Sequence, residues 1–308
     1  MDISIVLSTY NGQQYILEQL QSLLAQIRQP DEVLIFDDCS TDDTVQLICN
    51  FIKDNSLSNW TLIQNVRNKG WKQNFKDGIF ASKGDIIFPC DQDDIWFPSK
   101  LSDMERVMAE HPEINVLVSQ YIELYEDGKE NNLFEKNDGI CTRADWHQRL
   151  FNVLYPGCTF CIRKSFLPDI ENYWETYAHD AFLWRFAMLS GTAYIIRKPL
   201  IRWRKHIDST FQIDNRKERN YQGKLDWLEY ADGFIDKMTD YLNNATTLPK
   251  EEQIDGLMRY KHWIKLRRQF FQSRNPIYGI RLIQYMNCYS RSKQYLGDWV
   301  ITYIWRNR

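Results

Sequence analysis

The first hundred residues alternate between apolar runs and segments of helical periodicity, and this alternation restricts the possible folds more than any other feature. Residues 3–8 are a continuous apolar run of the kind that forms a strand buried on both faces. Further strands are expected at 32–36, 60–64 and 85–90, and helices at 13–26, 44–53 and 72–81. Strands separated by helices of about ten residues predict an α/β fold with a mostly parallel, doubly wound sheet.

The alternation weakens along the chain and then stops. We expect a helix at 100–111, a strand at 116–124, an aromatic-rich helix at 174–189 and a short strand at 193–196. After about residue 215, apolar residues recur only at helical spacing. The sequence therefore predicts an α/β domain over residues 1–215 and a basic, aromatic-rich helical region over residues 216–308.

Cysteine usage and hydropathy indicate a cytoplasmic protein. The seven cysteines are scattered, and Cys158 and Cys161, which have CxxC spacing, lack the second pair that a zinc site would need, so we interpret them as buried thiols. No apolar stretch of about 18 residues is present, and the N-terminal segment lacks the basic leader of a signal peptide.

The charge is distributed unevenly. Residues 259–308 contain eleven Lys or Arg and one acid, which gives +10, whereas the whole chain carries −3. The same fifty residues contain eleven aromatics. Basic and aromatic residues on amphipathic helices predict binding to an anionic membrane surface, on the inner face of the cell membrane, rather than to nucleic acid. The alternative is a helical cap that packs on the α/β domain.

Polar residues follow three of the expected strands, at 9–11, 37–38 and 91–94. In doubly wound sheets, ligands bind beyond the carboxyl ends of the strands. The third cluster holds Asp91, Asp93 and Asp94, and two such charges about 4 Å apart repel by roughly 4 kcal/mol at an effective dielectric near 20. A divalent cation removes this cost, so the cluster predicts a Mn²⁺ or Mg²⁺ site that also holds substrate phosphates. An acidic loop or a helix cap is the alternative.

The chain resembles the family 2 glycosyltransferases, which have the GT-A fold and invert the anomeric centre. The resemblance rests on the segments ISIVLSTYNG at 3–12, FDDCSTDDT at 36–44 and DQDDIW at 91–96. The DQDDIW form is most similar to a bacterial rhamnosyltransferase-like branch that builds surface polysaccharides. The resemblance implies metal-dependent transfer of a hexose, such as rhamnose, from a UDP- or dTDP-sugar to a glycan or to a saccharide on a polyprenyl diphosphate, in O-antigen or capsule synthesis.

The resemblance also assigns roles to the residues that bind the donor nucleotide. Asp38 corresponds to the carboxylate that accepts a hydrogen bond from the N3–H of uracil or thymine. Thr9, Tyr10 and Asn11 correspond to the rim of the nucleotide pocket, although Tyr10 could instead be a core residue. Asp91 corresponds to the ribose or metal contact.

Three further positions correspond to the metal and diphosphate site. Asp93 corresponds to the metal ligand, and Asp94 could orient the sugar or cap the next turn. His206 and Arg204 belong to a basic-aromatic run whose histidine or arginine, in related enzymes, closes over the diphosphate or completes the metal shell. A solvated basic loop is the alternative for this run.

Inverting transfer needs a general base, and Asp180 matches the family position for it at the start of a helix. A helix N-cap is the alternative for Asp180. His179, which replaces the usual glutamate of the family, could orient the acceptor, pack in the core or cap the helix. Gly157 lies in a segment that resembles the one beneath the acceptor site.

Two other functions compete with the glycosyltransferase. A sugar-1-phosphate nucleotidyltransferase would need a glycine-rich loop with an arginine after the first strand, and residues 9–14 have one glycine and no basic residue. A non-catalytic nucleotide-sugar-binding protein of an assembly complex is the remaining alternative, and the presence of Asp180 argues against it.

Overall fold

The computed structural model describes residues 1–145, 150–151, 153–206, 220–245 and 251–305, and they form two compact units. Unit 1 comprises Met1–Ala144 and Val153–His206, and unit 2 comprises the described residues of 145–152 and 207–308. The expected boundary near residue 215 lies outside the described residues.

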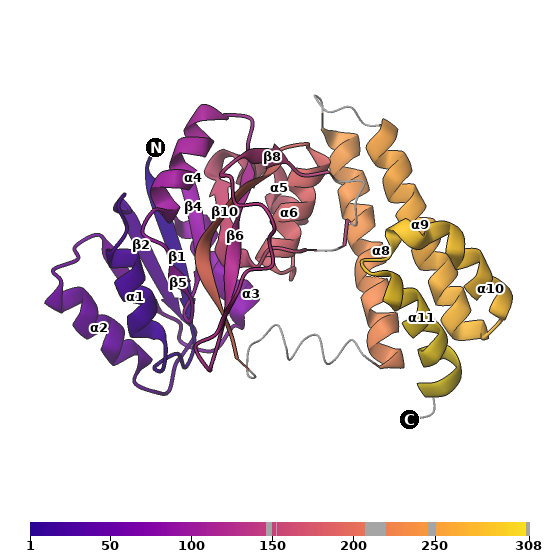
Figure 1. The fold of residues 1–308 in the computed structure, drawn as a ribbon, viewed down its shortest axis with the longest axis horizontal. Helices are drawn as coiled ribbons and strands as arrows, with labels where there is room; N and C mark the ends of the chain where they lie inside the picture. Colours follow the sequence, from indigo (N-terminus) through magenta and orange to yellow (C-terminus); the bar gives the residue numbers. More distant parts are fainter. Residues whose placement is uncertain (146–149, 152, 207–219, 246–250, 306–308) are drawn as a thin grey trace. The chain divides into compact units, whose positions relative to one another are not determined.

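Unit 1 is built on a mixed sheet with the strand order β3-β2-β1-β4-β9-β6-β10-β5, and β7 and β8 pair beside this path with β6 and β10 (Figure 1). The strands span Ile3–Thr9 (β1), Glu32–Asp37 (β2), Trp60–Gln64 (β3), Ile86–Asp91 (β4), Ile95–Trp96 (β5), Val116–Tyr125 (β6), Glu130–Asn131 (β7), Cys141–Arg143 (β8), Phe160–Arg163 (β9) and Ala193–Lys205 (β10). Strands β1 to β4 are parallel to one another, and so are β6 and β10. Strand β9 lies antiparallel between β4 and β6.

Helices cover both faces of this sheet. They span Ile16–Leu24 (α1), Thr44–Asp54 (α2), Trp71–Ala81 (α3), Lys100–Glu110 (α4), Leu167–Ile170 (α5) and His179–Leu189 (α6). The side chain of Gln19 in α1 bonds to Cys90, and that of Asn74 in α3 bonds to Ser8. Cys90 is paired with Leu7, so the side chains of these two residues point to the same face of the sheet. Ser8 follows Leu7 on β1, and successive strand residues point to opposite faces. Helices α1 and α3, which contact Cys90 and Ser8, therefore lie on opposite faces of the sheet. The strand order reverses between β1 and β4, because β2 and β3 lie on one side of β1 and β4 lies on the other, and such sheets bind ligands at this switch point.

Most elements expected from the sequence are present, with two differences. The helix expected at 174–189 begins at His179, because the backbone is extended at Trp174 and again at Ala178. The strand expected at 193–196 continues to Lys205 beside β6, with register shifts between Ile196 and Arg202. The extension carries the segment 204–206 to the carboxyl edge of the sheet.

Unit 2 is helical in its described part. Its helices are α8 (Tyr221–Asn244), α9 (Glu251–Ser273), α10 (Pro276–Arg281) and α11 (Ser292–Val300), with shorter turns at Leu282–Cys288 (η4) and Ile301–Trp305 (η5). Arg267 and Asp298 form a buried ion pair with two 2.8 Å hydrogen bonds, to which the Tyr289 hydroxyl donates a third. The one acid of residues 259–308 is therefore neutralised inside the unit.

No helix in the described part of the chain is long and apolar enough to cross a membrane.

Candidate active site at the carboxyl edge of the sheet

The loops after β1 and β2 are joined by hydrogen bonds. The side-chain oxygen of Asn11 accepts a hydrogen bond from the Thr41 backbone N–H at 2.8 Å. The backbone N–H of Asn11 donates to the Ser40 hydroxyl at 2.9 Å. Asn11 has a φ of 46°, a left-handed conformation that asparagine tolerates better than most residues. Tyr10 is 47% exposed, so it is a surface residue and not a core tyrosine. Thr9 is buried, and its hydroxyl oxygen has no hydrogen-bond partner among the described residues.

Asp38 is buried at the end of β2 and holds the following loop. Its carboxylate accepts hydrogen bonds from the Asn65 side chain at 2.9 Å and from the backbone N–H groups of Lys69 and Gly70 at 2.8 Å each. A carboxylate has about four acceptor positions, so one remains for a further donor. Asp37 bonds to the backbone and side chain of Ser40 and thereby shapes the turn.

The acidic cluster follows β4 and is met by the end of β10. The Asp93 carboxylate lies 2.7 Å from Nε2 of His206, whose ring packs on Tyr15. Arg204 donates its backbone N–H to Asp94 at 2.9 Å and its Nε–H to the Asp93 carbonyl at 2.7 Å. Residues more than a hundred positions apart in the sequence thus form one site, and both predicted members of the 202–206 run belong to it.

Burial makes this cluster electrostatically unfavourable. Burial, together with the charge of Asp93, raises the pKa of Asp94 from 3.8 to about 7. Burial and the charges of Asp94, Asp93 and Asp180 raise the pKa of Asp91 well above its usual value. One Asp94 oxygen is buried without a hydrogen-bond partner in the described part of the chain. These carboxyl groups are held close together at the expense of stability, which is typical of a ligand site.

Two buried residues beside the carboxylates were not predicted as members of the site. The Cys158 sulfur lies with oxygens of Asp91 and Asp94 in a group whose atoms are all within 4.8 Å of one another. Lys100 is fully buried with its ammonium group 4.7 Å from the ring centre of Trp96, and burial lowers its pKa to about 8. The CxxC spacing marks Cys158 as a buried thiol but does not place it beside Asp91 and Asp94, and Lys100 lies on an ordinary helix, so neither contact follows from a local pattern. Cys158 and Cys161 are free, buried thiols, as expected.

Asp180 lies in the first turn of α6, and its Oδ1 accepts from the Ala181 backbone N–H at 2.6 Å. Its charge contributes to the raised pKa of Asp91, so the two carboxyl groups lie within electrostatic range of each other.

The preceding residue, His179, is buried with its ring centre 4.2 Å from that of Phe75, and burial lowers its pKa. A Cβ at Gly157 would lie 2.1 Å from the His179 ring, so this glycine makes room for the histidine. His179 therefore packs in the core beside the site.

The donor set fits a hard divalent cation. Asp91 and Asp93 could supply carboxylate oxygens, His206 could supply an imidazole nitrogen, and the Asp94 oxygen without a hydrogen-bond partner among the described residues is a further candidate. Carboxylate oxygens suit Mg²⁺ and Mn²⁺. These residues lie at the same edge of the sheet as Tyr10, Asn11 and Asp38.

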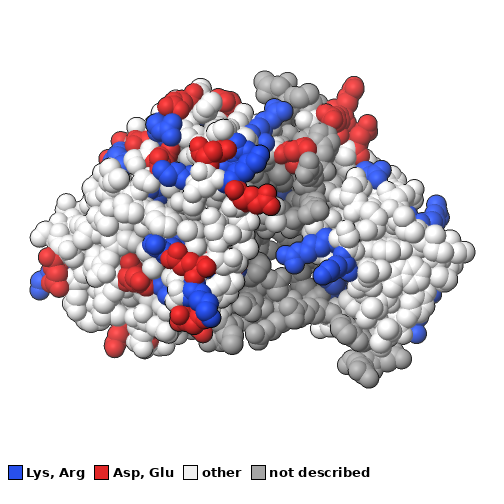
Figure 2. Space-filling model, viewed as in Figure 1, with Lys and Arg blue, Asp and Glu red and all other residues white. Residues whose placement is uncertain are grey.

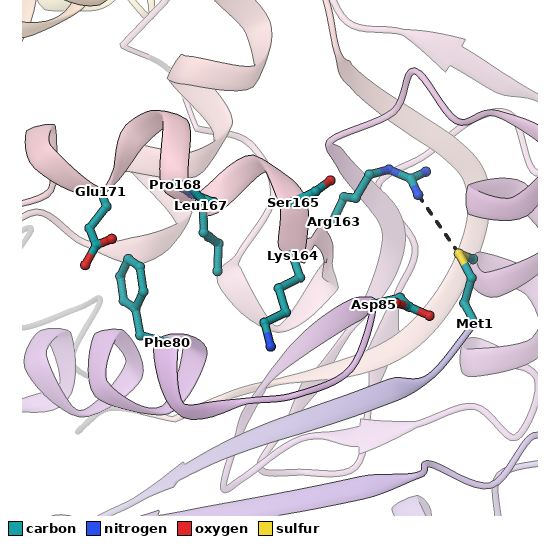
Figure 3. Close-up of a pocket in the computed structure, with 9 residues that line it drawn as sticks. All are labelled: Met1, Phe80, Asp85, Arg163, Lys164, Ser165, Leu167, Pro168 and Glu171. Carbon is teal, nitrogen blue, oxygen red and sulfur yellow. Dashed lines mark hydrogen bonds between the residues drawn. The ribbon is translucent and has the colours of Figure 1, made fainter.

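A separate cavity of about 620 Å³ lies at the opposite edge of the sheet (Figure 3). It is lined by Met1 and Asp85, which precede β1 and β4, and by Arg163, which ends the antiparallel β9. Arg163 donates hydrogen bonds to the carbonyls of Ile114, Met108 and His111, so its guanidinium group is engaged in holding the fold. None of the predicted site residues lines this cavity.

Comparison with known proteins shows the family of the chain. Residues 4–174 match the family model described as "Glycosyl transferase family 2". The dTDP-rhamnosyl transferase RfbG of Shigella flexneri is 31% identical over 214 residues, which cover 65% of this chain and 71% of that protein.

Two solved structures share the fold. TarS residues 1–349 from S. aureus, in complex with UDP-GlcNAc, superposes with a TM-score of 0.63 at 21% identity and covers 98% of this chain and 81% of that one. The mannosyltransferase PcManGT from Pyrobaculum calidifontis, in complex with GDP-Man and Mn²⁺, gives a TM-score of 0.54 at 14% identity and covers 99% and 88%. These similarities confirm the expected fold class.

Proposed function

The chain belongs to glycosyl transferase family 2, and we propose that it transfers a sugar, with inversion, from a UDP- or dTDP-sugar to a glycan or lipid-linked saccharide of a bacterial surface polysaccharide such as an O-antigen or capsule. One observation carries this proposal: Asp93, paired with His206, and Asp180 both lie within electrostatic range of Asp91 at the carboxyl edge of the sheet, where the strand order reverses. The similarity to a dTDP-rhamnosyl transferase supports rhamnose as the sugar.

The donor nucleotide would bind across the loops after β1 and β2. Asp38 keeps one acceptor position for the N3–H of uracil or thymine, a group that purine nucleotides do not present in the same place. The exposed ring of Tyr10 offers a flat surface for the base, Asn11 fixes the loop beside it, and the hydroxyl of Thr9, unpartnered among the described residues, lies at the rim of the pocket. Asp91 would contact the ribose or the metal.

Asp93 and His206 would hold Mn²⁺ or Mg²⁺, with Asp91 and Asp94 adding charge. The bound ion would neutralise the carboxylates and the diphosphate leaving group. Arg204 is positioned to support this arrangement, because its two hydrogen bonds fix the backbone of Asp93 and the carboxylate of Asp94. The donor is thereby oriented at the carboxyl edge.

Asp180 would act as the general base that takes the proton from the acceptor hydroxyl. Its Oδ1 is held by the Ala181 N–H, which fixes the orientation of the side chain and leaves Oδ2 for the acceptor. His179 would act indirectly, because its buried ring packs on Phe75 and sets the position where α6 begins. The acceptor, on a polyprenyl diphosphate, would be met at the inner face of the cell membrane.

The test is a thermal-shift screen of the full chain against UDP-, dTDP- and GDP-sugars, with Mn²⁺ or with EDTA. Stabilisation follows RT ln(1 + [L]/Kd), about 2.7 kcal/mol at a hundredfold excess over Kd. We expect a UDP- or dTDP-sugar to raise the melting temperature only with the metal. Equal stabilisation by the GDP-sugar, or by all donors in EDTA, would contradict the assignment of Asp38 or of Asp93.

A further inference from the structure

Unit 2 exposes apolar residues where a helical unit of this size normally shows polar ones. Ile277, Ile280 and Ile283 are 59%, 59% and 56% exposed, all within seven residues of α10 and η4. Scattered surface isoleucines are ordinary, but a cluster of this kind marks an interaction surface. We refer to these three residues as the isoleucine stripe.

The stripe is a consequence of how α10 packs. A Cβ at Gly279 would lie 2.4 Å from the Trp299 ring and 2.8 Å from that of Phe270, so α10 presses its glycine side against the core. Leu282 is fully buried on that side. The isoleucines project from the remaining surface of the same segment and cannot be buried within the unit.

Most of the described aromatic residues of 259–305 are buried or half-buried. Trp263, Phe270, Phe271 and Tyr289 lie in the core of unit 2, whereas Tyr303 is 47% exposed. Two further exposed apolar residues, Leu296 and Ile304, lie outside the segment of the isoleucine stripe, so the stripe is the densest exposed apolar group of α10 and η4.

A small basic cavity lies next to the stripe. It has a volume of about 270 Å³, and its lining includes His262, Lys265, Arg281 and Tyr285. Arg281 lies between Ile280 and Ile283 in the sequence, so the basic cavity and the stripe share one segment. Neither Lys265 nor Arg281 pairs with an acid among the described residues, whereas Lys261 and Arg268 pair with acids of α8.

The described residues from 256 to 305 expose basic side chains and no acidic one. Asp298 is the one acid of residues 256–305, and it is buried against Arg267. In Figure 2, the surface over α10 and α11 is mostly uncharged on the face shown, with a few blue atoms and no red ones. Exposed basic residues on α9 to α11 are Arg259, Lys265, Arg274, Arg281, Arg291 and Lys293.

We propose that the isoleucine stripe and the basic cavity form a docking surface for an anionic lipid bilayer. The isoleucines would enter the boundary between headgroups and acyl chains, and Lys265 and Arg281 would meet a lipid phosphate in the cavity. Charge complementarity favours this partner. Every basic residue around the cavity is attracted to a uniformly anionic lipid surface, whereas a partner protein whose surface carries both signs of charge would attract some of them and repel others. This inference rests on the proposed function and adds a binding surface to it. Its test needs neither the sugar donor nor the acceptor, so the membrane proposal can fail while the transferase function holds, and the reverse.

The test is co-sedimentation of the full chain with vesicles of phosphatidylcholine alone or with about one third phosphatidylglycerol, a composition chosen for its surface charge. We expect binding to the anionic vesicles, weakened by salt because the attraction is screened. Each charge removed should lower the partition coefficient about fivefold, so Lys265→Gln with Arg281→Gln should lower it about 25-fold. Ile280→Ser with Ile283→Ser should lower it at least tenfold, since the buried apolar area is lost.

The matched controls lie on unit 1: Lys53→Gln with Lys83→Gln for charge, and Ile27→Ser for an exposed isoleucine, all at exposed positions. These controls should bind as the wild type does, and all variants should keep its circular dichroism spectrum. Equal binding to neutral vesicles, or equal loss in the unit 1 controls, would overturn the proposal. A change of mass in the isoleucine variants by analytical ultracentrifugation, without loss of vesicle binding, would identify the stripe as a self-association surface and also overturn it.

Discussion

Replacing Asp94 with asparagine should make the metal-free protein more stable at pH 8 and leave its stability at pH 4 almost unchanged. The folded protein raises the pKa of Asp94 from 3.8 to about 7, because the group is buried and lies beside the charge of Asp93. A carboxyl group with a higher pKa in the folded state binds its proton more tightly there. Its ionisation therefore costs stability progressively as the pH rises from about 4 to about 7.

The magnitude follows from the size of the shift. A rise from 3.8 to about 7 is roughly three pKa units, and each unit corresponds to about 1.36 kcal/mol, so the cost reaches ~4 kcal/mol above pH 7. Asparagine keeps an oxygen that can accept the Arg204 N–H and removes the charge. We therefore expect Asp94→Asn to gain up to ~4 kcal/mol at pH 8.

The assay is urea unfolding in EDTA at pH 4, 6 and 8, followed by circular dichroism. The exposed Asp54→Asn variant is the control and should match the wild type at each pH. A gain for Asp94→Asn of the same size at pH 4 and pH 8 would refute the electrostatic explanation. A loss of stability at pH 8 would show that the carboxylate stabilises the fold even without metal.

Three further predictions concern neighbouring residues. Asp93→Asn should abolish Mn²⁺-dependent binding of the nucleoside diphosphate in calorimetry while the protein remains folded; unchanged binding would exclude Asp93 as a metal ligand. Asp180→Asn should lower kcat by about 10²–10⁴-fold with donor affinity retained, since the base contacts the acceptor; a wild-type kcat would place the base elsewhere. Gly157→Ala should destabilise the protein by about 1–3 kcal/mol in urea unfolding, because the new methyl group would overlap the His179 ring; wild-type stability would mean that the ring has room to move.

The parallel half of the sheet could be predicted from the sequence because its signals are local. Strands β1 to β4 are apolar runs, and helices α1 to α3 have clear periodicity, so both appear where expected. Strand β9 was not predicted, since its four residues are inserted antiparallel between β4 and β6 by tertiary pairing. The length of β10 likewise depends on pairing with β6 and not on its own composition.

The site was predictable where a motif marked it. Asp93 and His206 could be connected through the family resemblance, and the structure brings them to 2.7 Å. The proximity of Cys158 to the carboxylates and the burial of Lys100 depend on contacts that no short pattern encodes. The same holds for the helical region after residue 216. Its periodicity predicts helices but does not show which of its apolar residues are exposed.

The most direct test of the account is release of nucleoside diphosphate. The full chain would be incubated with Mn²⁺, each nucleotide-sugar that stabilises it, and lipid-linked saccharides extracted from bacterial membranes. We predict release by the wild type with a UDP- or dTDP-sugar, and at least hundredfold slower release by Asp180→Asn. A wild-type protein that binds the donor yet releases no nucleoside diphosphate would contradict the account and identify a nucleotide-sugar-binding protein without transferase activity.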